Sequence, residues 1–387
     1  ALSRPYRRGM DFPVFDMPYL GNRLLVALIA ITHVLINHPL AVGAYPLLTL
    51  LEWHGMRSGD ARWDRLARKV TSICFIVTTS VGALTGVGIW LVTALVAPFA
   101  IGSLLRVFFW AWFAEWLVFI TEVVLIMVYY LTWSRWTSPR MKRVHVGVGA
   151  ALAMFSWLTM AIIVAILGFM MAPGAWGDDR SLLSGVVNPL YPPQLAFRTT
   201  YSMVSGGLFL LACCFAVLRR DEALRHDAVR RISFWILGWL PLCAAAATWY
   251  WRSVPDAMQA QLGVGLLTQA LVDWQDQFVR LIAAAVLIIG AVAALGAWHP
   301  RRLPAVALVV PFLLAIWMLG HFERAREFIR KPYVIADYMY SNGVRLAELP
   351  IYQRDGMLRW ASFARVHEVT PNNQWHAGRE VFALACS

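Results

Sequence analysis

The chain has 387 residues, of which 59% are hydrophobic and only 14% are charged. This balance excludes an ordinary soluble domain and indicates a protein solvated largely by lipid. Lys and Arg number 34 against 22 Asp and Glu, a formal net charge of +12. The basic residues lie in short loops and not along one stripe, so the charge does not indicate a nucleic-acid partner.

The first 21 residues are basic and aromatic and lack the apolar core of a cleavable signal. We interpret residues 1–21 as an N-terminal surface segment. The chain has five cysteines, and the first four lie inside apolar runs, where a free thiol behaves as a small hydrophobe. The cysteine pattern therefore indicates no disulfide framework.

Residues 22–322 contain the apolar stretches expected of membrane-spanning helices. A hydrocarbon core of about 30 Å needs roughly 20 helical residues. Stretches of this kind occur at about 22–51, 70–97, 104–132, 144–172, 199–218, 232–250, 277–298 and 303–322. The sequence therefore predicts an all-α, polytopic transmembrane bundle of about eight helices.

The loops alternate between basic and nearly uncharged. Those after spans one, three, five and seven hold most of the Arg and Lys, whereas those after spans two, four and six hold little beyond Arg180, Arg198 and Arg252. By the positive-inside rule the first set is cytoplasmic, and both termini lie on the outer side of a bacterial inner membrane. Residues 323–387 then form a short exported tail.

A few titratable side chains lie at membrane depth, where each costs several kcal/mol unless it is paired, hydrated or bound to a cofactor. At about 1.5 Å per residue, the first histidine of span one lies roughly 16 Å along its helix. The two glutamates of span three are seven residues apart and share one helical face. The candidates on spans one, three and eight are His33, His38, Glu115, Glu122, His321, Glu323 and Glu327.

Three helices thus bring imidazole and carboxylate groups to similar outer depths. Imidazole is a standard axial ligand of haem iron, and haem propionates need partners such as Arg326 and Arg330, so haem fits this inventory better than zinc. Two other interpretations stay open. One is that His33 is a buried histidine that hydrogen-bonds a neighbouring helix. The other is that Glu115 and Glu122 form helix–helix hydrogen bonds or a proton path. We interpret His145, His226 and His299 as interfacial or loop residues.

At this point the residues resemble a known family, subunit I of the cytochrome bd-type oxidases. The resemblance covers most of residues 20–335, and it depends on the shared order and spacing of several segments. These are HPLAVG from His38, GALTGVGIW, FAEWLVFITE, the RVHVGVGAALAMFSWLTMAIIVAILGFMMAP stretch, NPLYPPQLAF and the closing RKPY.

The resemblance implies specific roles. His33 corresponds to the ligand of a haem in a two-haem oxygen-reducing site, and Glu327 to a carboxylate ligand of its partner haem, with Glu323 as a substitute because the spacing here differs from the family's. Glu115 and Glu122 correspond to glutamates that serve the haem or its proton supply. The implied cofactors are haem b and/or haem d, and the implied partner is a second, similar membrane subunit.

The sequence also departs from the family. Members bind a further, low-spin haem b between a span-five histidine, shortly after an Asn-Pro pair, and a span-seven methionine. Here the two segments read AFRTTYSM and FVRLIAAAVLIIG, and we interpret Met203 as a packing residue. The loop from about Arg252 to Gln277 is also too short for the family's quinol site. We therefore do not expect quinol oxidation in its usual place.

The end of the tail suggests a replacement electron donor. HAGREVFALACS resembles the opening helix of a c-type cytochrome, which would make Cys386 the first cysteine of a C-x-x-C-H haem-attachment motif. This predicts a covalent haem c at Cys386 and a c-type cytochrome as donor. The alternative is a natural end with a free thiol.

The leading hypothesis is thus a bd-oxidase-like membrane haem protein that passes electrons from an outer c-type haem or another donor to haems in the outer half of the bundle, for oxygen reduction. The rival is a non-catalytic electron-transfer or membrane-anchor subunit of a larger respiratory complex. A transporter with buried carboxylates, a third reading, predicts no haem.

Overall fold

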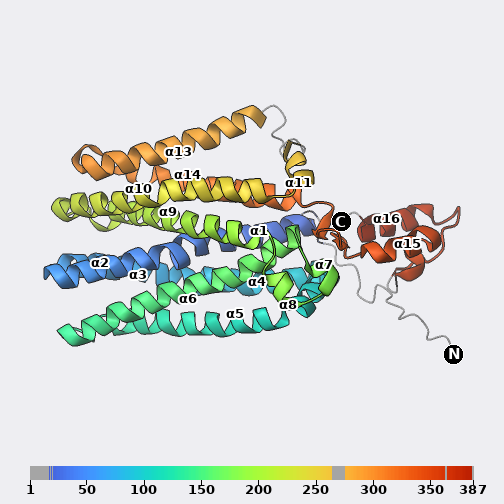
Figure 1. The fold of residues 1–387 in the computed structure, drawn as a ribbon, viewed down its shortest axis with the longest axis horizontal. Helices are drawn as coiled ribbons and strands as arrows, with labels where there is room; N and C mark the ends of the chain where they lie inside the picture. Colours follow the sequence, from blue (N-terminus) through green and yellow to red (C-terminus); the bar gives the residue numbers. More distant parts are fainter. Residues whose placement is uncertain (1–16, 18, 20, 264–274, 362–363, 386–387) are drawn as a thin grey trace.

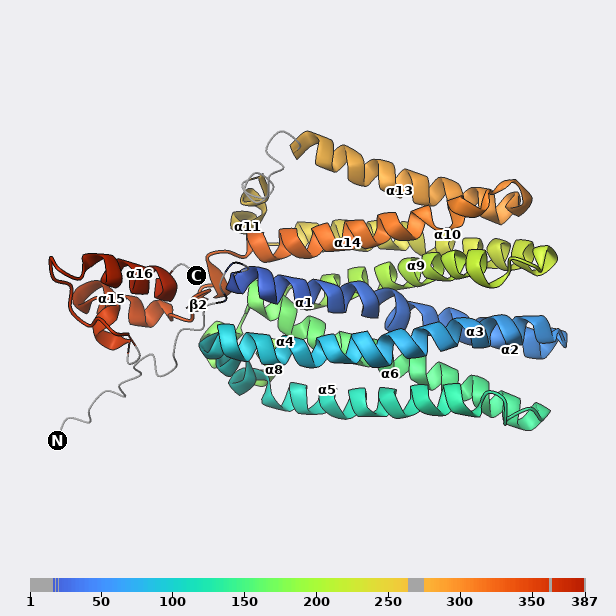
Figure 2. The same cartoon turned by 180° about the vertical axis from the view of Figure 1, so that it is seen from behind.

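Long helices run side by side along one axis in the computed structural model, which describes residues 17, 19, 21–263, 275–361 and 364–385 (Figures 1 and 2). Eight helical stretches of this described part are long and apolar enough to cross a membrane. The all-α, multi-pass fold class is therefore confirmed.

The first two spans are each interrupted by a π-helical segment. Span one consists of α1 (Asn22–Ile36), η1 (Asn37–Gly43) and α2 (Ala44–Ser58). Span two consists of α3 (Ala61–Val77), η2 (Thr78–Gly82) and α4 (Ala83–Val96). The sharp turn between them uses Gly59 in the left-handed region (φ 69°), followed by Asp60, whose side chain accepts a hydrogen bond from the Arg62 amide.

The other spans are single helices: α5 (Pro98–Thr132), α6 (Pro139–Met171), α9 (Tyr191–Val217), α10 (Glu222–Ser253), α13 (Gln275–Trp298) and α14 (Val310–Ile329). Shorter helices occupy some connections: α7 (Trp176–Asp179), α8 (Leu182–Val186), α11 (Asp256–Ala260), η5 (Pro300–Arg302) and η6 (Ala305–Leu308). The bundle end where α1 begins and α14 finishes is called the tail end here, and the opposite end the far end.

The tail forms a small unit beyond the tail end (Figure 1). Strands β1 (Tyr333–Ile335) and β2 (Met339–Tyr340) pair antiparallel. The Ala336 amide donates to the carbonyl oxygen of Met170 on α6 at 3.0 Å, which ties the unit to the bundle. The remaining tail elements are η7 (Leu346–Glu348), α15 (Leu349–Asp355), η8 (Leu358–Trp360) and α16 (Gln374–Ala385).

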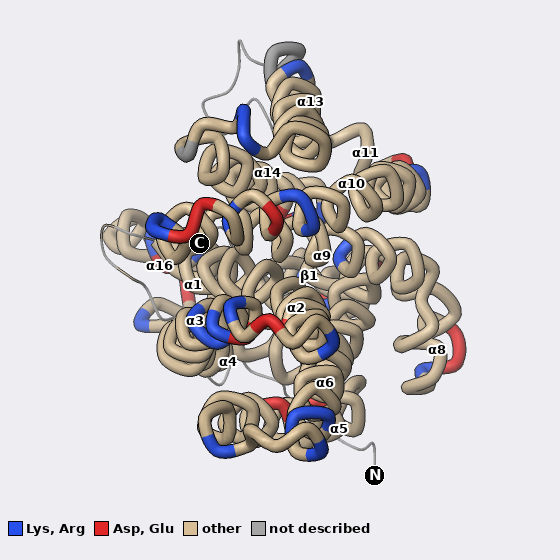
Figure 3. Tube along the Cα trace, turned by 90° about the vertical axis from the view of Figure 1, so that its left-hand side faces the viewer, with Lys and Arg blue, Asp and Glu red and all other residues tan. Residues whose placement is uncertain are grey.

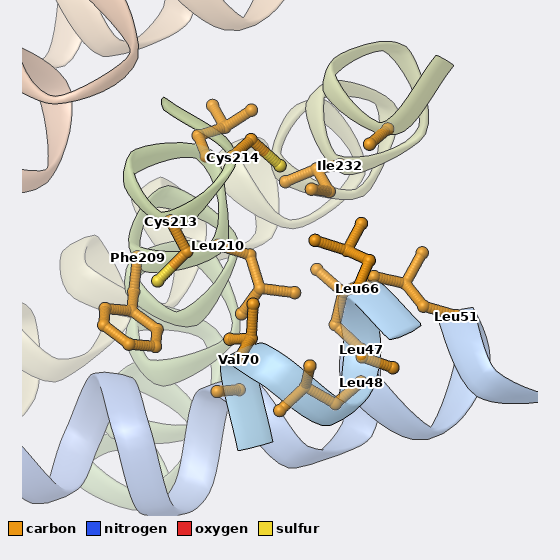
Figure 4. Packing of buried hydrophobic residues seen from close by; sticks show 14 of the residues in the cluster. Leu47, Leu48, Leu51, Leu66, Val70, Phe209, Leu210, Cys213, Cys214 and Ile232 are labelled. Atoms are coloured by element: carbon orange, nitrogen blue, oxygen red, sulfur yellow. The ribbon is translucent and has the colours of Figure 1, made fainter. Parts of the chain in front are cut away.

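The largest apolar core joins α2, α3, α9 and α10 toward the far end (Figure 4). Its leucines, isoleucine and valine interdigitate with the thiol-bearing side chains of Cys213 and Cys214, which are buried and free, as the sequence predicts. Viewed along the bundle, the basic residues mark the helix ends and connecting segments, while most of the helix walls are uncharged (Figure 3). This is the charge distribution expected of a chain with lipid-facing walls.

Candidate functional site

His33 lies on α1 against the start of α4. Its Nδ1 is 3.1 Å from the carbonyl oxygen of Gly82, and the side chains of Thr85 and Asn37 also reach the ring. Gly86 makes room for the imidazole, because a Cβ there would lie 3.1 Å from His33 Cε1. Asn37 Nδ2 lies 2.9 Å from both ring nitrogens, so in this arrangement the Nε2 lone pair of His33 faces the Asn37 amide. An Nδ1–H that donates to a backbone carbonyl is the usual outer contact of a metal-ligating imidazole, and a metal at Nε2 would take the place of the Asn37 amide.

His38, on the π-helical segment η1, is engaged by protein on both sides of its ring. Arg198 Nη1 donates to its Nε2 at 3.0 Å, and the ring also hydrogen-bonds the backbone of Val34. The guanidinium has no lone pair to offer, so Nε2 must be the acceptor. Both ring nitrogens of His38 thus have protein partners in this arrangement, and its role as a cofactor-binding residue stays a prediction.

A buried ion-pair network connects η1, α9 and α14 near the tail end. Arg198 Nη2 donates to Glu323 Oε1 at 2.6 Å, and Arg326 Nε donates to Glu323 Oε2 at 3.1 Å. Arg198 is 1% exposed and Glu323 6% exposed. Together with His38, these residues form what we call the tail-end network. Both oxygens of Glu323 are occupied by guanidinium groups, so the carboxylate is held by protein and not offered to a ligand.

Glu327 lies one turn farther along α14 and differs from Glu323 in its surroundings. It pairs with Arg330 at 2.5 Å and Lys331 at 3.1 Å, yet 44% of its side chain stays exposed. Burial lowers the pKa of Lys331 despite this carboxylate partner. His321, on the same helix, packs edge-on against Trp317. Both oxygens of Glu327 thus have basic partners, as those of Glu323 do, but the Glu327 side chain is the more exposed of the two carboxylates predicted on span eight.

Several buried donors around these residues have no hydrogen-bond partner within the described part of the chain. They are Arg198 Nε, Arg326 Nη1, Arg330 Nε and Nε2 of Gln194, one turn before Arg198 on α9; the acceptor Oε1 of Gln194 has no partner either. Buried polar atoms of folded proteins are normally satisfied, so such a cluster of donors indicates a missing anionic or polar group. The guanidinium donors fit the propionates predicted at Arg326 and Arg330.

Of the two glutamates of α5, Glu122 contacts α6. Glu122 accepts hydrogen bonds from Ser156 Oγ at 2.7 Å and Thr159 Oγ1 at 3.0 Å. Glu115 is half-buried seven residues toward the tail end, about 10 Å along the helix. Helix–helix hydrogen bonding, one of the two alternatives left open for this pair, is therefore present at Glu122.

A second buried network lies toward the far end, and we call it the far-end network. Glu52 and His145 are each 0% exposed, with His145 Nδ1 2.6 Å from Glu52 Oε1 and its Nε2 2.8 Å from the carbonyl oxygen of Tyr129. The Tyr129 hydroxyl donates to Glu52 Oε2 at 2.7 Å, and Lys142 bridges Glu52 and Asp64. The interpretation of His145 as an interfacial residue was therefore wrong.

Haem is compatible with the geometry near His33 and Glu327. No cluster of three or more His, Cys, Asp or Glu side chains that could hold a bare metal ion occurs among the described residues. Haem needs no such cluster, because the porphyrin supplies four nitrogens and the protein one or two axial ligands. An imidazole held at Nδ1, an accessible carboxylate and unpartnered guanidinium donors are the groups that the cofactor requires.

The family's low-spin haem does not fit. The segment in which the resemblance places its histidine presents Arg198, whose guanidinium is always protonated and has no acceptor lone pair. That side chain is already committed to Glu323 and His38. The sequence of α13 contains no methionine to act as the second ligand.

Cys386 lies outside the described residues. The sequence analysis also missed residues that lie within them: Arg198, Asn37, Gly86, Glu52 and the pairing of His145. A signal for some of them was present, since Gly82 and Gly86 form a G-x-x-x-G pattern, which allows close approach of another helix. Here the approaching groups are the His33 ring and the Asn37 amide.

Comparisons with known proteins agree with the resemblance. No match was found among curated protein sequences. The chain is similar to a chain in the structure of bd oxidase from Geobacillus thermodenitrificans, with a TM-score of 0.70, 18% sequence identity, and coverage of 88% of this chain and 94% of that chain. This likeness shows the shared fold. The family model for cytochrome bd terminal oxidase subunit I matches residues 22–254. The chain belongs to the cytochrome bd terminal oxidase subunit I family and is a membrane respiratory protein of the haem-binding, electron-transporting kind.

Proposed function

We propose that the chain binds a pair of haems at the tail end of the bundle and uses them to reduce oxygen. The arrangement of His33 is the observation that carries this proposal, because its Nδ1 faces the Gly82 carbonyl and its Nε2 is the atom that would bind iron in place of the Asn37 amide. His33 would hold one haem and Glu327 its partner. Arg326 and Arg330 would hold propionates. When bound, haem supplies the open iron coordination position and the one-electron chemistry that oxygen reduction requires.

The residues of the chain then orient the cofactor and supply protons. Gly82 and Thr85 fix the His33 ring, and Gly86 sets its distance from α4. Glu122 holds a carboxyl group between Ser156 and Thr159, from which protons pass toward Glu115 and the tail end. By the positive-inside rule, the far end is cytoplasmic and the tail lies outside, which places proton uptake and the haems on opposite sides.

For cofactors, partner and electron donor, the proposal follows the pattern of the family. That pattern is haem b and/or haem d, a second membrane subunit and quinol as reductant. The comparisons give no support to a covalent haem at Cys386 or a c-type cytochrome donor. Both reductants therefore belong in the test.

The first measurement is a reduced-minus-oxidised absorption spectrum of the purified protein, with and without carbon monoxide, together with haem per chain. We expect haem bands that respond to carbon monoxide, and we expect His33→Ala to reduce the haem content. His226→Ala, near the start of α10, is the control and should leave both unchanged. A spectrum without haem, or one unaltered by His33→Ala, would contradict the proposal.

Oxygen uptake then separates catalysis from relay. With a reduced quinol or a reduced c-type cytochrome, we expect consumption that falls at least 10-fold in Glu115→Gln while haem content is retained. The rival function, a non-catalytic electron-transfer or anchor subunit, is favoured by one observation, the ion pair at Arg198 in place of a haem ligand. It predicts haem bands that ignore carbon monoxide and no oxygen uptake with either donor.

A further inference from the structure

The tail-end network occupies the region in which the family pattern requires a haem. Arg198 belongs to the α9 segment in which a histidine ligand is expected, and it points into the bundle, where its exposure is 1%. Glu323 approaches it from α14 and His38 from η1. The three elements that would enclose a cofactor at this position are joined instead by direct side-chain contacts.

The buried charges of the tail-end network are compensated by contacts within the protein. Taking a guanidinium and a carboxylate out of water is costly, and the pair is tolerated only with short contacts and satisfied lone pairs. Glu323 meets that condition, since Arg198 and Arg326 each donate to one of its oxygens. The Arg198 aliphatic stem and guanidinium also pack over the Phe322 ring, with Cζ 5.6 Å from its centroid. These contacts compensate the Glu323 carboxylate and fill the position with protein side chains, although Arg198 Nε and Arg326 Nη1 keep no partner among the described residues.

The same arginine is connected to the proposed haem ligand through η1. This segment packs directly on α9, because Gly43 and Gly206 lack side chains and let the two backbones touch. Arg198, also on α9, hydrogen-bonds His38 near the start of the same segment. Asn37, the first residue of η1, reaches the His33 ring at 2.9 Å. The position of the π-helical segment therefore determines how the His33 ring is presented.

We infer that the Arg198–Glu323 pair replaces the family's low-spin haem in this chain, and that Arg198 is a positioning residue that sets the orientation of His33 through His38 and η1. The second part rests on the proposed function, in which His33 holds haem. Electrons then reach the haems near His33 and Glu327 without a further haem inside the bundle.

The replacement is tested by electron paramagnetic resonance and haem quantification on the oxidised, purified protein. We expect the wild-type protein and His33→Ala to lack any six-coordinate low-spin signal attributable to a His–Met haem. A low-spin signal that persists in His33→Ala would overturn the inference and leave the proposed function intact. Absence of haem from the wild-type protein would overturn the proposed function and, with it, this inference.

The positioning role is tested with Arg198→Met/Glu323→Leu, which removes both charges and keeps apolar volume, so that the fold survives. We expect the same haem per chain as in wild type, with a shifted carbon monoxide difference spectrum and a changed midpoint potential for the haem lost in His33→Ala. Arg225→Met/Glu222→Leu removes a surface ion pair of α10 and is the matched control, which should shift neither. A double variant with an unaltered spectrum would overturn the positioning role. Loss of one haem in that variant would also overturn it, because it would make Glu323 a ligand.

Discussion

The tail-end network and the far-end network are both buried groups of charged residues, yet they are completed in different ways. In the far-end network the two oxygens of Glu52 and the two ring nitrogens of His145 all have protein partners. In the tail-end network, Arg198 Nε and Arg326 Nη1 are buried without a partner among the described residues. The Glu52–His145 pair at the centre of the far-end network is fully partnered, whereas the tail-end network has donors left over.

This difference distinguishes a structural function from a binding function. A pair whose donors and acceptors all have protein partners offers none to a ligand. The Glu52–His145 pair instead stabilises the contact between helices α2, α5 and α6. An open network with surplus guanidinium N–H groups is suited to anionic groups such as propionates. Burial of charge alone does not identify a binding site. The informative observation is which polar atoms remain unpartnered after the protein contacts are assigned.

The largest expected effect comes from breaking the tail-end network on one side. Arg198→Met leaves Glu323 buried beside one remaining arginine, and we expect a loss of about 3–5 kcal/mol in the free energy of unfolding. Arg198→Met/Glu323→Leu should recover most of it, because no uncompensated charge remains. Equilibrium unfolding of the detergent-solubilised protein measures both. A double variant as unstable as the single one would show that the pair is not the source of the effect.

The far-end network should be less sensitive to a single change. His145→Ala removes one partner of Glu52, but Lys142 and Tyr129 continue to hydrogen-bond the carboxylate. We expect a loss of about 1–3 kcal/mol from the missing hydrogen bonds and packing, measured in the same unfolding assay. Haem content should be unchanged. A fall in haem per chain would mean that the far-end network also shapes the binding region.

Gly86→Ala is expected to change the stability less than the variants above, but to change the absorption spectrum clearly. A Cβ there would lie 3.1 Å from His33 Cε1, so Gly86→Ala should displace the imidazole and shift the Soret band. Gly147→Ala on α6 is the matched control, because nothing lies within 4 Å of its new Cβ. That variant should gain up to about 1 kcal/mol from helix propensity, with no spectral change. Equal spectra for the two variants would contradict the placement of His33 against α4.

The smallest effect is expected at the exposed ion pair that caps α3. Hydrogen bonds from Arg62 lower the pKa of Asp60 below its ordinary value. The stabilisation is therefore present above the ordinary Asp range and is lost as pH falls through the lowered folded-state value. Asp60→Asn should flatten that acid limb slightly when unfolding midpoints are compared from pH 5 down to pH 2.5. An unchanged limb would assign the acid sensitivity to the buried networks.

Most of the fold was predictable from the sequence because lipid imposes a simple rule. A spanning segment must be apolar and long, so the eight stretches and their alternating basic loops could be read directly. The π-helical interruptions of the first two spans could not be assigned in the same way: Pro39 in NHPLAVG and the polar residues of TTSVG permit an irregular helix but do not specify a π-turn. Tertiary packing on α9 and α4 determines them.

The candidate site was predictable only in part. His33 and Glu327 stood out because titratable groups are rare at membrane depth. His38 stood out for the same reason, but its partner Arg198 is 160 positions away, and no spacing rule reveals such a pairing. His145 looked interfacial because it is close to a helix end, whereas its burial depends on Glu52 from another span. Pairings between distant spans decide which of these residues is available to a cofactor.

The π-helical segment η1 has a consequence for how the two networks relate to each other. Each residue of an α-helix advances the side-chain direction by about 100°, and a π-turn accommodates an extra residue without disturbing the helix on either side. The extra residue of η1 thus sets the angle between the part of span one that carries His33 and the part that carries Glu52. Removing one residue between Asn37 and Gly43 would restore a continuous α-helix and turn His33 away from Gly82, while Glu52 kept its face. The segment works as an angular spacer between two halves of a single span.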